Sequence, residues 1–239
     1  MPANPFHRIK CAKYYSHIGF LARGGTMIVT DITTTGGDPG FTAHAGATFG
    51  GLAAAFVVLP AARIATSLHT SEYGKGYALF EVAGTAQGDL LAVRERVRDG
   101  APVHPDPWFE ASIAAGLKRA GLPSRGARMA DDPTRNPADN PMIVEFFPDD
   151  GEPGFLGRPG ITFGELAVAF AAMPSDAVAT ILDTDGDYFT VIGTRPENLI
   201  STRDNMAAQI IVEPGGMAWF FNSISTALAR FQRRGDLAA

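Results

Sequence analysis

An internal repeat constrains the fold of this chain more than any other sequence feature. Residues 39–70 align without a gap on residues 153–184, and most of the identical positions hold glycine, proline, phenylalanine or threonine rather than alanine. Low-complexity alanine sequence cannot produce such matches, so the chain is predicted to be a tandem duplication. The identical pairs include Pro39/Pro153, Gly40/Gly154, Phe41/Phe155, Gly46/Gly160, Thr48/Thr162, Phe49/Phe163, Gly50/Gly164, Leu52/Leu166, Ala53/Ala167, Phe56/Phe170, Pro60/Pro174, Thr66/Thr180, Leu68/Leu182 and Thr70/Thr184.

The similarity extends to a tryptophan near the end of each copy. Trp108-Phe109 pairs with Trp219-Phe220, and serine, isoleucine, leucine and arginine follow in register. Between the copies lies a segment rich in proline, aspartate, asparagine and arginine with no apolar period, which is typical of a linker. The predicted organisation is a basic N-terminal extension (1–26), a first repeat (27–122), a linker (123–141), a second repeat (142–235) and a C-terminal tail (236–239).

The central segment of each repeat, TFGxLAxAFxxxP, has apolar residues at helical spacing. This pattern predicts a helix with one buried face that stops at the proline, and it places Phe56 and Phe170 in matched buried positions. Thr162 and Glu165 form the sequence pattern of a capping box. The first copy has Gly51 where the second has the glutamate, so its helix is predicted to be the more weakly capped.

Two β-rich segments follow each helix. In the second copy they are Ala177–Thr184 and Tyr188–Gly193, separated by Asp185-Gly186, which favours a tight type I′ hairpin turn. In the first copy they are Arg63–Thr70 and Tyr77–Ala83, joined by a longer loop.

The remaining elements complete a predicted β-α-β-β-(loop)-β-α module. A further strand is expected at Ala207–Glu213, with a partner at Leu91–Val97 whose pattern is also compatible with a helix. The closing helices are expected at Trp108–Ala120 and Trp219–Arg233. The predicted fold class is therefore α+β, with antiparallel sheets, helices on one face, and the two modules in a pseudo-two-fold arrangement.

Composition excludes several classes of protein. The formal net charge is −5, so no basic face is predicted for nucleic acid. The single cysteine, Cys11, allows neither an internal disulfide nor structural zinc, and indicates a cytoplasmic protein. Ala45–Ala62 is uncharged over almost the length of a membrane span, but its copy, Pro159–Asp176, contains two acidic residues. We therefore expect no membrane span.

Ligand-binding candidates come from polar residues that both copies share. Arg94-Glu95 in the first copy matches Arg203-Asp204 in the second, and two arginines brought to the groove between the modules would suit a carboxylate or phosphate. Two pairs of solvated surface charges explain the match equally simply.

Three other features have a functional and a structural interpretation. Residues 183–187 are similar to a calcium loop, but the glycine is too early for one and a hairpin turn suffices. Asp149, Asp150 and Glu152 form either a cation site or an acidic solvent-facing loop. The glycine-rich start of each central helix suits either an anion or a tight turn.

The N-terminal extension has four basic residues and no acidic residue. It is either a docking arm for an acidic partner or membrane surface, a targeting segment, or a dispensable appendage before a start at Met27, which we favour.

The copies share almost no candidate catalytic acid, base or nucleophile: His44 faces Arg158 and His69 faces Asp183. We therefore predict a non-enzymatic binding protein of inhibitor, immunity, regulatory or mobile-element accessory type, without cofactor or metal. It would hold a protein partner or small ligand in the groove between the modules. The alternative is an enzyme that keeps an asymmetric site in one copy, at His69, at His104 or in the 183–187 loop.

Overall fold

Two antiparallel sheets form the framework of the protein in a computed structural model. It describes residues 15–16, 29–35, 38–73, 77–100, 106–122, 143–146, 152–209 and 218–234. The first sheet has the strand order β1-β2-β3-β5-β4 and the second the order β6-β7-β9-β8. The strands are β1 (Tyr15–Ser16), β2 (Val29–Thr35), β3 (Asp38–His44), β4 (Ile64–Tyr73), β5 (Tyr77–Thr85), β6 (Ile143–Phe146), β7 (Gly154–Gly157), β8 (Val178–Thr184) and β9 (Phe189–Thr194).

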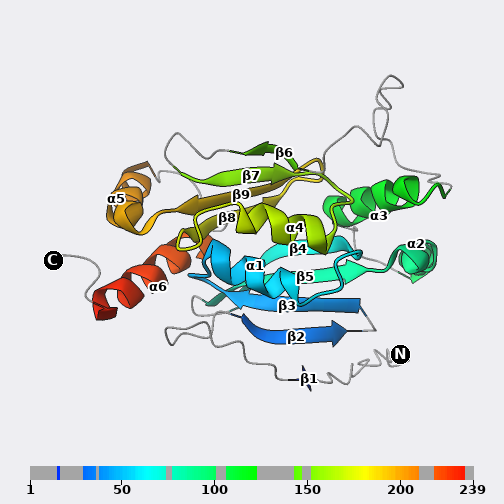
Figure 1. Ribbon diagram of the computed structural model, residues 1–239, viewed down its shortest axis with the longest axis horizontal. Helices are drawn as coiled ribbons and strands as arrows, with labels where there is room; N and C mark the ends of the chain where they lie inside the picture. The colour runs from blue at the N-terminus through cyan, green and yellow to red at the C-terminus, as the bar shows by residue number, and fades with distance from the viewer. Residues whose placement is uncertain are drawn as a thin grey trace, which may run out of the picture.

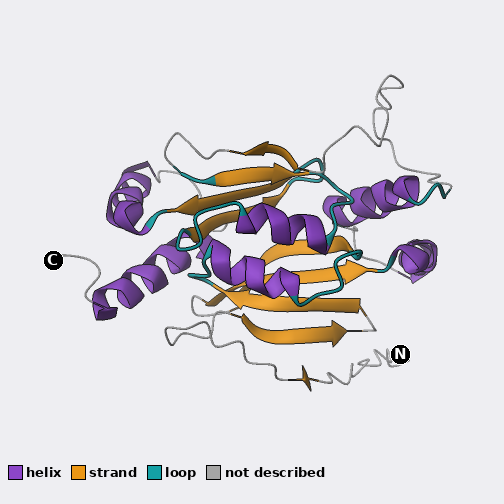
Figure 2. Ribbon diagram, in the orientation of Figure 1, coloured by secondary structure: helices purple, strands orange, loops and turns teal. Residues whose placement is uncertain are grey.

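Helices complete a mixed α+β fold, as the sequence predicted. Figure 2 shows a pair of helices in front of the strands and further helices at the ends of the described part of the molecule. In Figure 1, α1 and α4 lie side by side in front of the strands, whereas α2 and α5 lie at opposite ends. The helices are α1 (Phe49–Val57), α2 (Leu90–Gly100), α3 (Pro107–Arg119), α4 (Phe163–Ala171), α5 (Leu199–Gln209) and α6 (Ala218–Arg234), with short 3₁₀ turns at Gln87–Asp89 and Pro196–Asn198.

Two strands, not one, precede each central helix, which corrects the predicted module. The second of them, β3 or β7, contains the repeated Gly-Phe pair, Gly40-Phe41 or Gly154-Phe155. A Cβ atom on Gly40 would collide with the carbonyl oxygen of Val82, and one on Gly154 with that of Val191. The glycine is therefore required by close approach of the neighbouring strand, a constraint that lies far away in the sequence.

The strand predicted at Ala207–Glu213 is wrong for residues 207–209, which belong to α5; the rest lies outside the described residues. Its expected partner at 91–97 is helical, within α2. In each half a 3₁₀ turn leads directly into the helix, and the first helical residue, Leu90 or Leu199, is fully buried. Burial of this leucine stabilises the start of the helix, whereas residue propensity alone did not distinguish helix from strand.

The β8–β9 hairpin turns one residue beyond the predicted Asp185-Gly186. Thr184 pairs with Phe189, and the Asp185 amide donates to the Tyr188 carbonyl at 3.3 Å, so Gly186 and Asp187 form the tip of the turn. The Asp185 carboxylate accepts hydrogen bonds from the amides of Asp187 at 3.0 Å and Tyr188 at 2.8 Å. These bonds stabilise the turn, as aspartate often does.

Part of the N-terminal extension belongs to a sheet. Tyr15 and Ser16 form β1 and pair with Thr33 and Ile32 of β2. Removal of residues before Met27 would therefore take away the edge pairing of the first sheet, although the rest of the extension lies outside the described residues.

Both halves contribute to one central core. The largest cluster of buried apolar residues contains Phe41, Phe56 and Trp108 from the first half and Phe155, Phe170 and Trp219 from the second. The Phe56 and Phe170 rings stack at 5.6 Å with 12° between their planes. The two halves therefore depend on each other for burial of their aromatic residues.

A candidate protein-interaction surface

Helices α1 and α4 meet where the two halves join. The amide of Gly50, near the start of α1, donates to the carbonyl of Ser175, beyond the end of α4, at 2.9 Å. Near the start of α4, the Gly164 amide donates to the Ala61 carbonyl, beyond the end of α1, also at 2.9 Å. Each helix thus begins beside the end of the other, so the two run antiparallel.

The outward side of this helix pair is apolar. Val57 is 69% exposed and Val168 is 70% exposed, although both are large hydrophobic residues. Their exposed neighbours on α1, α4 and the following turns are mainly alanine. We call this surface the α1–α4 face; it consists of Ala54, Val57, Val58, Pro60, Ala61, Ala62, Val168, Ala171 and Ala172.

An apolar outward side is unusual for helices that are also apolar inward. The inner side of α1 buries Phe49, Leu52 and Phe56, so the helix is hydrophobic all round. Such helices are normally buried completely, whereas surface helices carry charge on the solvent side. Contiguous exposed apolar residues usually mark an interaction site. The α1–α4 face is therefore the strongest candidate functional site.

The amides at the start of each helix are already bonded within the protein. Phe49 and Gly50 donate to the carbonyls of Ala177 and Ser175, and Gly51 donates to the Thr48 hydroxyl at 3.2 Å. The start of α4 is bonded in the same way to Ala61, Arg63 and Thr162. The anion site suggested by the glycine-rich sequence would need these donors, so neither helix start is open to a phosphate.

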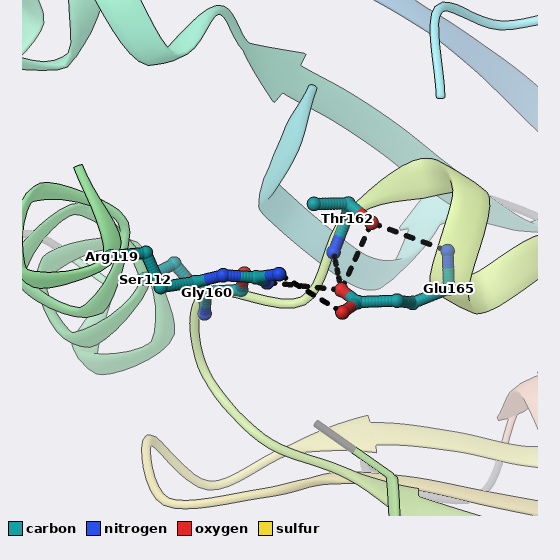
Figure 3. Close-up of polar contacts among 5 residues, drawn as sticks. All are labelled: Ser112, Arg119, Gly160, Thr162 and Glu165. Carbon is teal, nitrogen blue, oxygen red and sulfur yellow. Dashed lines mark hydrogen bonds and ion pairs between the residues drawn. The ribbon is translucent and has the colours of Figure 1, made fainter. Parts of the chain in front are cut away.

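One end of the face is held by a polar cluster (Figure 3). Thr162 and Glu165 form the predicted capping box, which is confirmed. Arg119 reaches across from α3 and donates to both Glu165 carboxylate oxygens at 3.1 Å and to the Gly160 carbonyl at 3.0 Å. The Ser112 hydroxyl accepts from the Gly160 amide at 3.4 Å. The cluster therefore ties α3 of the first half to the start of α4 in the second.

These bonds set the charge state of Glu165. Partial burial alone would raise the pKa of its carboxyl, but the bonds from Arg119 and from the amide and hydroxyl of Thr162 outweigh burial. The net effect lowers the pKa below the ordinary value of 4.5. The carboxylate form is therefore favoured in the folded protein.

We expect Glu165 to stabilise the fold above about pH 4.5, its ordinary pKa, and to lose this contribution as pH falls through the lower folded pKa. The measurement is the free energy of unfolding of wild type and Glu165→Gln at pH 7 and pH 3. Glutamine retains the capping geometry, so the wild-type advantage at pH 7 should shrink at pH 3. Glu197→Gln, at an exposed position, is the control. An advantage that is constant with pH would contradict the prediction.

The matched position in the first half has a related contact without a glutamate. Arg230 of α6 is buried and donates to the Gly46 carbonyl at 3.1 Å. The Ser223 hydroxyl accepts from the Gly46 amide at 3.1 Å. Gly51 occupies the position that matches Glu165, so this position has no carboxylate in the first half. Arg230 contacts a backbone carbonyl there, whereas Arg119 contacts both a backbone carbonyl and a carboxylate.

The structure does not bring together the two charge pairs predicted from sequence. Arg94 and Glu95 on α2 form an ion pair with each other at 3.1 Å, and Arg203 and Asp204 on α5 do so at 2.9 Å. These helices lie at opposite ends of the molecule (Figure 1). Ligand binding by either pair alone stays a prediction. Binding of one ligand by both arginines would require α2 and α5 to lie close together, and they do not (Figure 1).

His69 lies on an exposed part of β4. Its Nδ1 is 3.0 Å from the Ser67 hydroxyl, and its Nε2 is 3.8 Å from a carboxylate oxygen of Glu81 on β5. The 183–187 segment forms the end of β8 and the turn after it. His104, Asp149 and Asp150 lie outside the described residues. Across the part of the chain that the structure describes, no group of three or more potential metal-binding side chains occurs.

We expect His69→Ala to change the free energy of unfolding by no more than about 0.5 kcal/mol, because exposed cross-strand contacts contribute little. Denaturant midpoints measure this directly. A larger loss would show that the Ser67–His69–Glu81 contacts hold the hairpin together.

One sequence feature corresponds to the α1–α4 face. The uncharged run Ala45–Ala62 includes both the buried side and the exposed side of α1. Among the described helices, none combines the length and apolar character needed to cross a bilayer. Compared with known proteins, the chain matches no family model, no curated protein and no solved structure.

Proposed function

We propose that this chain is a non-enzymatic protein-interaction protein whose partner docks on the α1–α4 face. The observation that carries the proposal is a set of nine exposed apolar residues on two adjoining helices and the turns that follow them, with Asp176 as the exposed charged residue of those turns. An inhibitor, a regulatory protein and a mobile-element accessory protein would all use such a surface. Docking here would place the partner where the two halves meet.

We further propose that the halves are duplicated modules in a pseudo-two-fold arrangement, with helices covering one face of each sheet. Matched contacts support this. The Trp108 indole donates to the Ala65 carbonyl and the Trp219 indole to the Ala179 carbonyl, both at 3.1 Å. Strands β2-β3-β5-β4 and β6-β7-β9-β8 have the same order. The α1–α4 face then straddles the junction of the modules, with six of its residues from the first module and three from the second.

We expect the double substitution Val57→Lys/Val168→Lys to abolish partner binding while the fold is retained. Both side chains point to solvent in the free protein, so lysine is tolerated there, but docking would bury its charge. The measurement is purification of each variant from the native host, with identification of the proteins that co-purify, and thermal unfolding of the purified variants.

Ile200→Lys is the matched control, because Ile200 is also an exposed large hydrophobic residue but lies on α5, away from the face. It should retain every partner that wild type has. If the double variant co-purifies with the same proteins as wild type, the proposed function is wrong.

Catalysis in one half is the second candidate, and the contacts of His69 with Ser67 and Glu81 are the observation that favours it. A His69→Ala variant that folds and binds normally but loses a measured activity would replace the binding proposal with this one.

A further inference from the structure

From the size and charge of the α1–α4 face we infer that its occupant is a single amphipathic helix of a partner protein. The inference rests on the proposed function, since it names the partner of the same surface. Three properties of the face carry it: its extent, the size of its side chains, and the charges at its two ends.

The extent of the face argues against a stable contact with a second copy. A stable interface generally engages about 20–30 residues on each side, or roughly 800 Å² per partner. The α1–α4 face has nine exposed apolar residues. The face alone therefore supplies fewer residues than a lasting dimer engages on each side. One helix, by contrast, needs only a narrow apolar strip.

The length of the face matches a short helix. Each of α1 and α4 has nine residues, which span about 13–14 Å at 1.5 Å per residue. A partner helix of about three turns would cover the line where α1 and α4 meet. On each helix the exposed residues recur at i, i+3 and i+4, as in Ala54, Val57 and Val58. Helix–helix contacts use this spacing.

The small side chains of the face determine which side chains of the partner fit against it. Alanine is the commonest residue in the face, and the larger phenylalanine rings of both helices point inward. Small side chains on one helix permit close approach and leave room for large ones on the other. The partner is therefore expected to present leucine, phenylalanine or methionine at i, i+3 or i+4, and i+7.

The charges at the two ends orient the partner. Asp176 is exposed at the end where α1 begins, whereas Arg230 at that end is buried. At the other end, Arg119 is ion-paired with Glu165, and Arg63 adds a second guanidinium. A complementary helix carries basic residues at the Asp176 end and acidic residues at the opposite end. Because helices favour acidic residues at their N-terminus and basic residues at their C-terminus, the partner helix should run parallel to α4.

A phage-displayed library of random peptides of about 16 residues, long enough for four turns, provides the probe. Selection uses the full chain, with Val57→Lys/Val168→Lys as the counter-selection target. Enriched peptides should carry apolar residues at i, i+3 or i+4, and i+7, with basic residues in their C-terminal half. By fluorescence anisotropy, they should bind the double variant at least tenfold more weakly than wild type and bind Ile200→Lys as wild type does.

Three outcomes would overturn the inference. Enriched peptides with alternating apolar residues would mean that the occupant is an extended strand. Equal binding to wild type and the double variant would place the helix site elsewhere. A dimer in sedimentation equilibrium that the double variant converts to monomer would identify the occupant as a second copy. In this last case the face is still an interaction surface, so the proposed function is retained. The proposed function is contradicted by a different result, namely that the double variant co-purifies with the same proteins as wild type.

Discussion

Replacement of Phe56 or Phe170 by alanine is expected to lower the free energy of unfolding by about 3–5 kcal/mol, the usual loss for a phenylalanine removed from a packed core. Phe56 is 1% exposed and Phe170 is fully buried. Besides stacking on each other, Phe56 packs edge-on against Phe41 at 4.9 Å and Phe170 against Phe155 at 5.0 Å. Each substitution thus opens a cavity between several rings, in a protein whose class is stable by only about 5–15 kcal/mol.

Chemical denaturation of the two variants and of wild type measures the loss. Val168→Ala, in the same helix as Phe170 but facing solvent, is the matched control and should change stability little. The double variant Phe56→Ala/Phe170→Ala should depart from additivity by at least about 0.5 kcal/mol, because the rings are in contact. A loss below about 1 kcal/mol in either single variant would mean that the two helices do not hold the halves together.

The elements that the sequence predicted well depend on neighbours along the chain. The threonine caps, the capping box of Thr162 with Glu165, and the burial of Phe56 and Phe170 follow from residues within a few positions of each other. Local hydrogen bonds and helical periodicity decide such features. They are therefore accessible from a single sequence.

The elements that it missed depend on contacts between distant segments. Gly40 belongs to a strand because the carbonyl of Val82 leaves no space for a side chain, and nothing next to Gly40 in the sequence records this. The helical start at Leu199 likewise depends on burial against α6. Local propensity at these positions fitted turn, strand and helix equally well.

The two charge pairs predicted as a candidate site lie apart for a geometric reason. Positions that match in two repeats come together only where the repeats meet, and α2 and α5 are far from that line (Figure 1). Arg94 and Arg203 therefore share a sequence position without sharing a site. Helices α1 and α4 do meet, but their exposed residues are small and apolar. Side chains of that type are typical of a protein core, so only their exposure in the structure marks them as a candidate site.

The contact between the halves also predicts a large effect from a single methyl group. A Cβ atom on Gly84 of β5 would lie inside the van der Waals radius of the Phe163 ring, and one on Gly193 of β9 would do the same to Phe49. Both rings are fully buried, so neither can swing into solvent. Gly84→Ala and Gly193→Ala are each expected to lower the free energy of unfolding by about 1–3 kcal/mol through overpacking.

The compensating variant tests the cause of this loss. Gly84→Ala combined with Phe163→Leu should be less destabilised than the sum of the two single variants, because the smaller leucine vacates the space that the methyl group needs. Gly88→Ala is the matched control, since a Cβ there meets nothing within 4 Å. Denaturant midpoints of the four variants and wild type decide the outcome. If Gly84→Ala is as mild as Gly88→Ala, the Phe163 ring has room to move. The interlocking of each half's phenylalanine with the other half's glycine would then contribute little to holding the two sheets together.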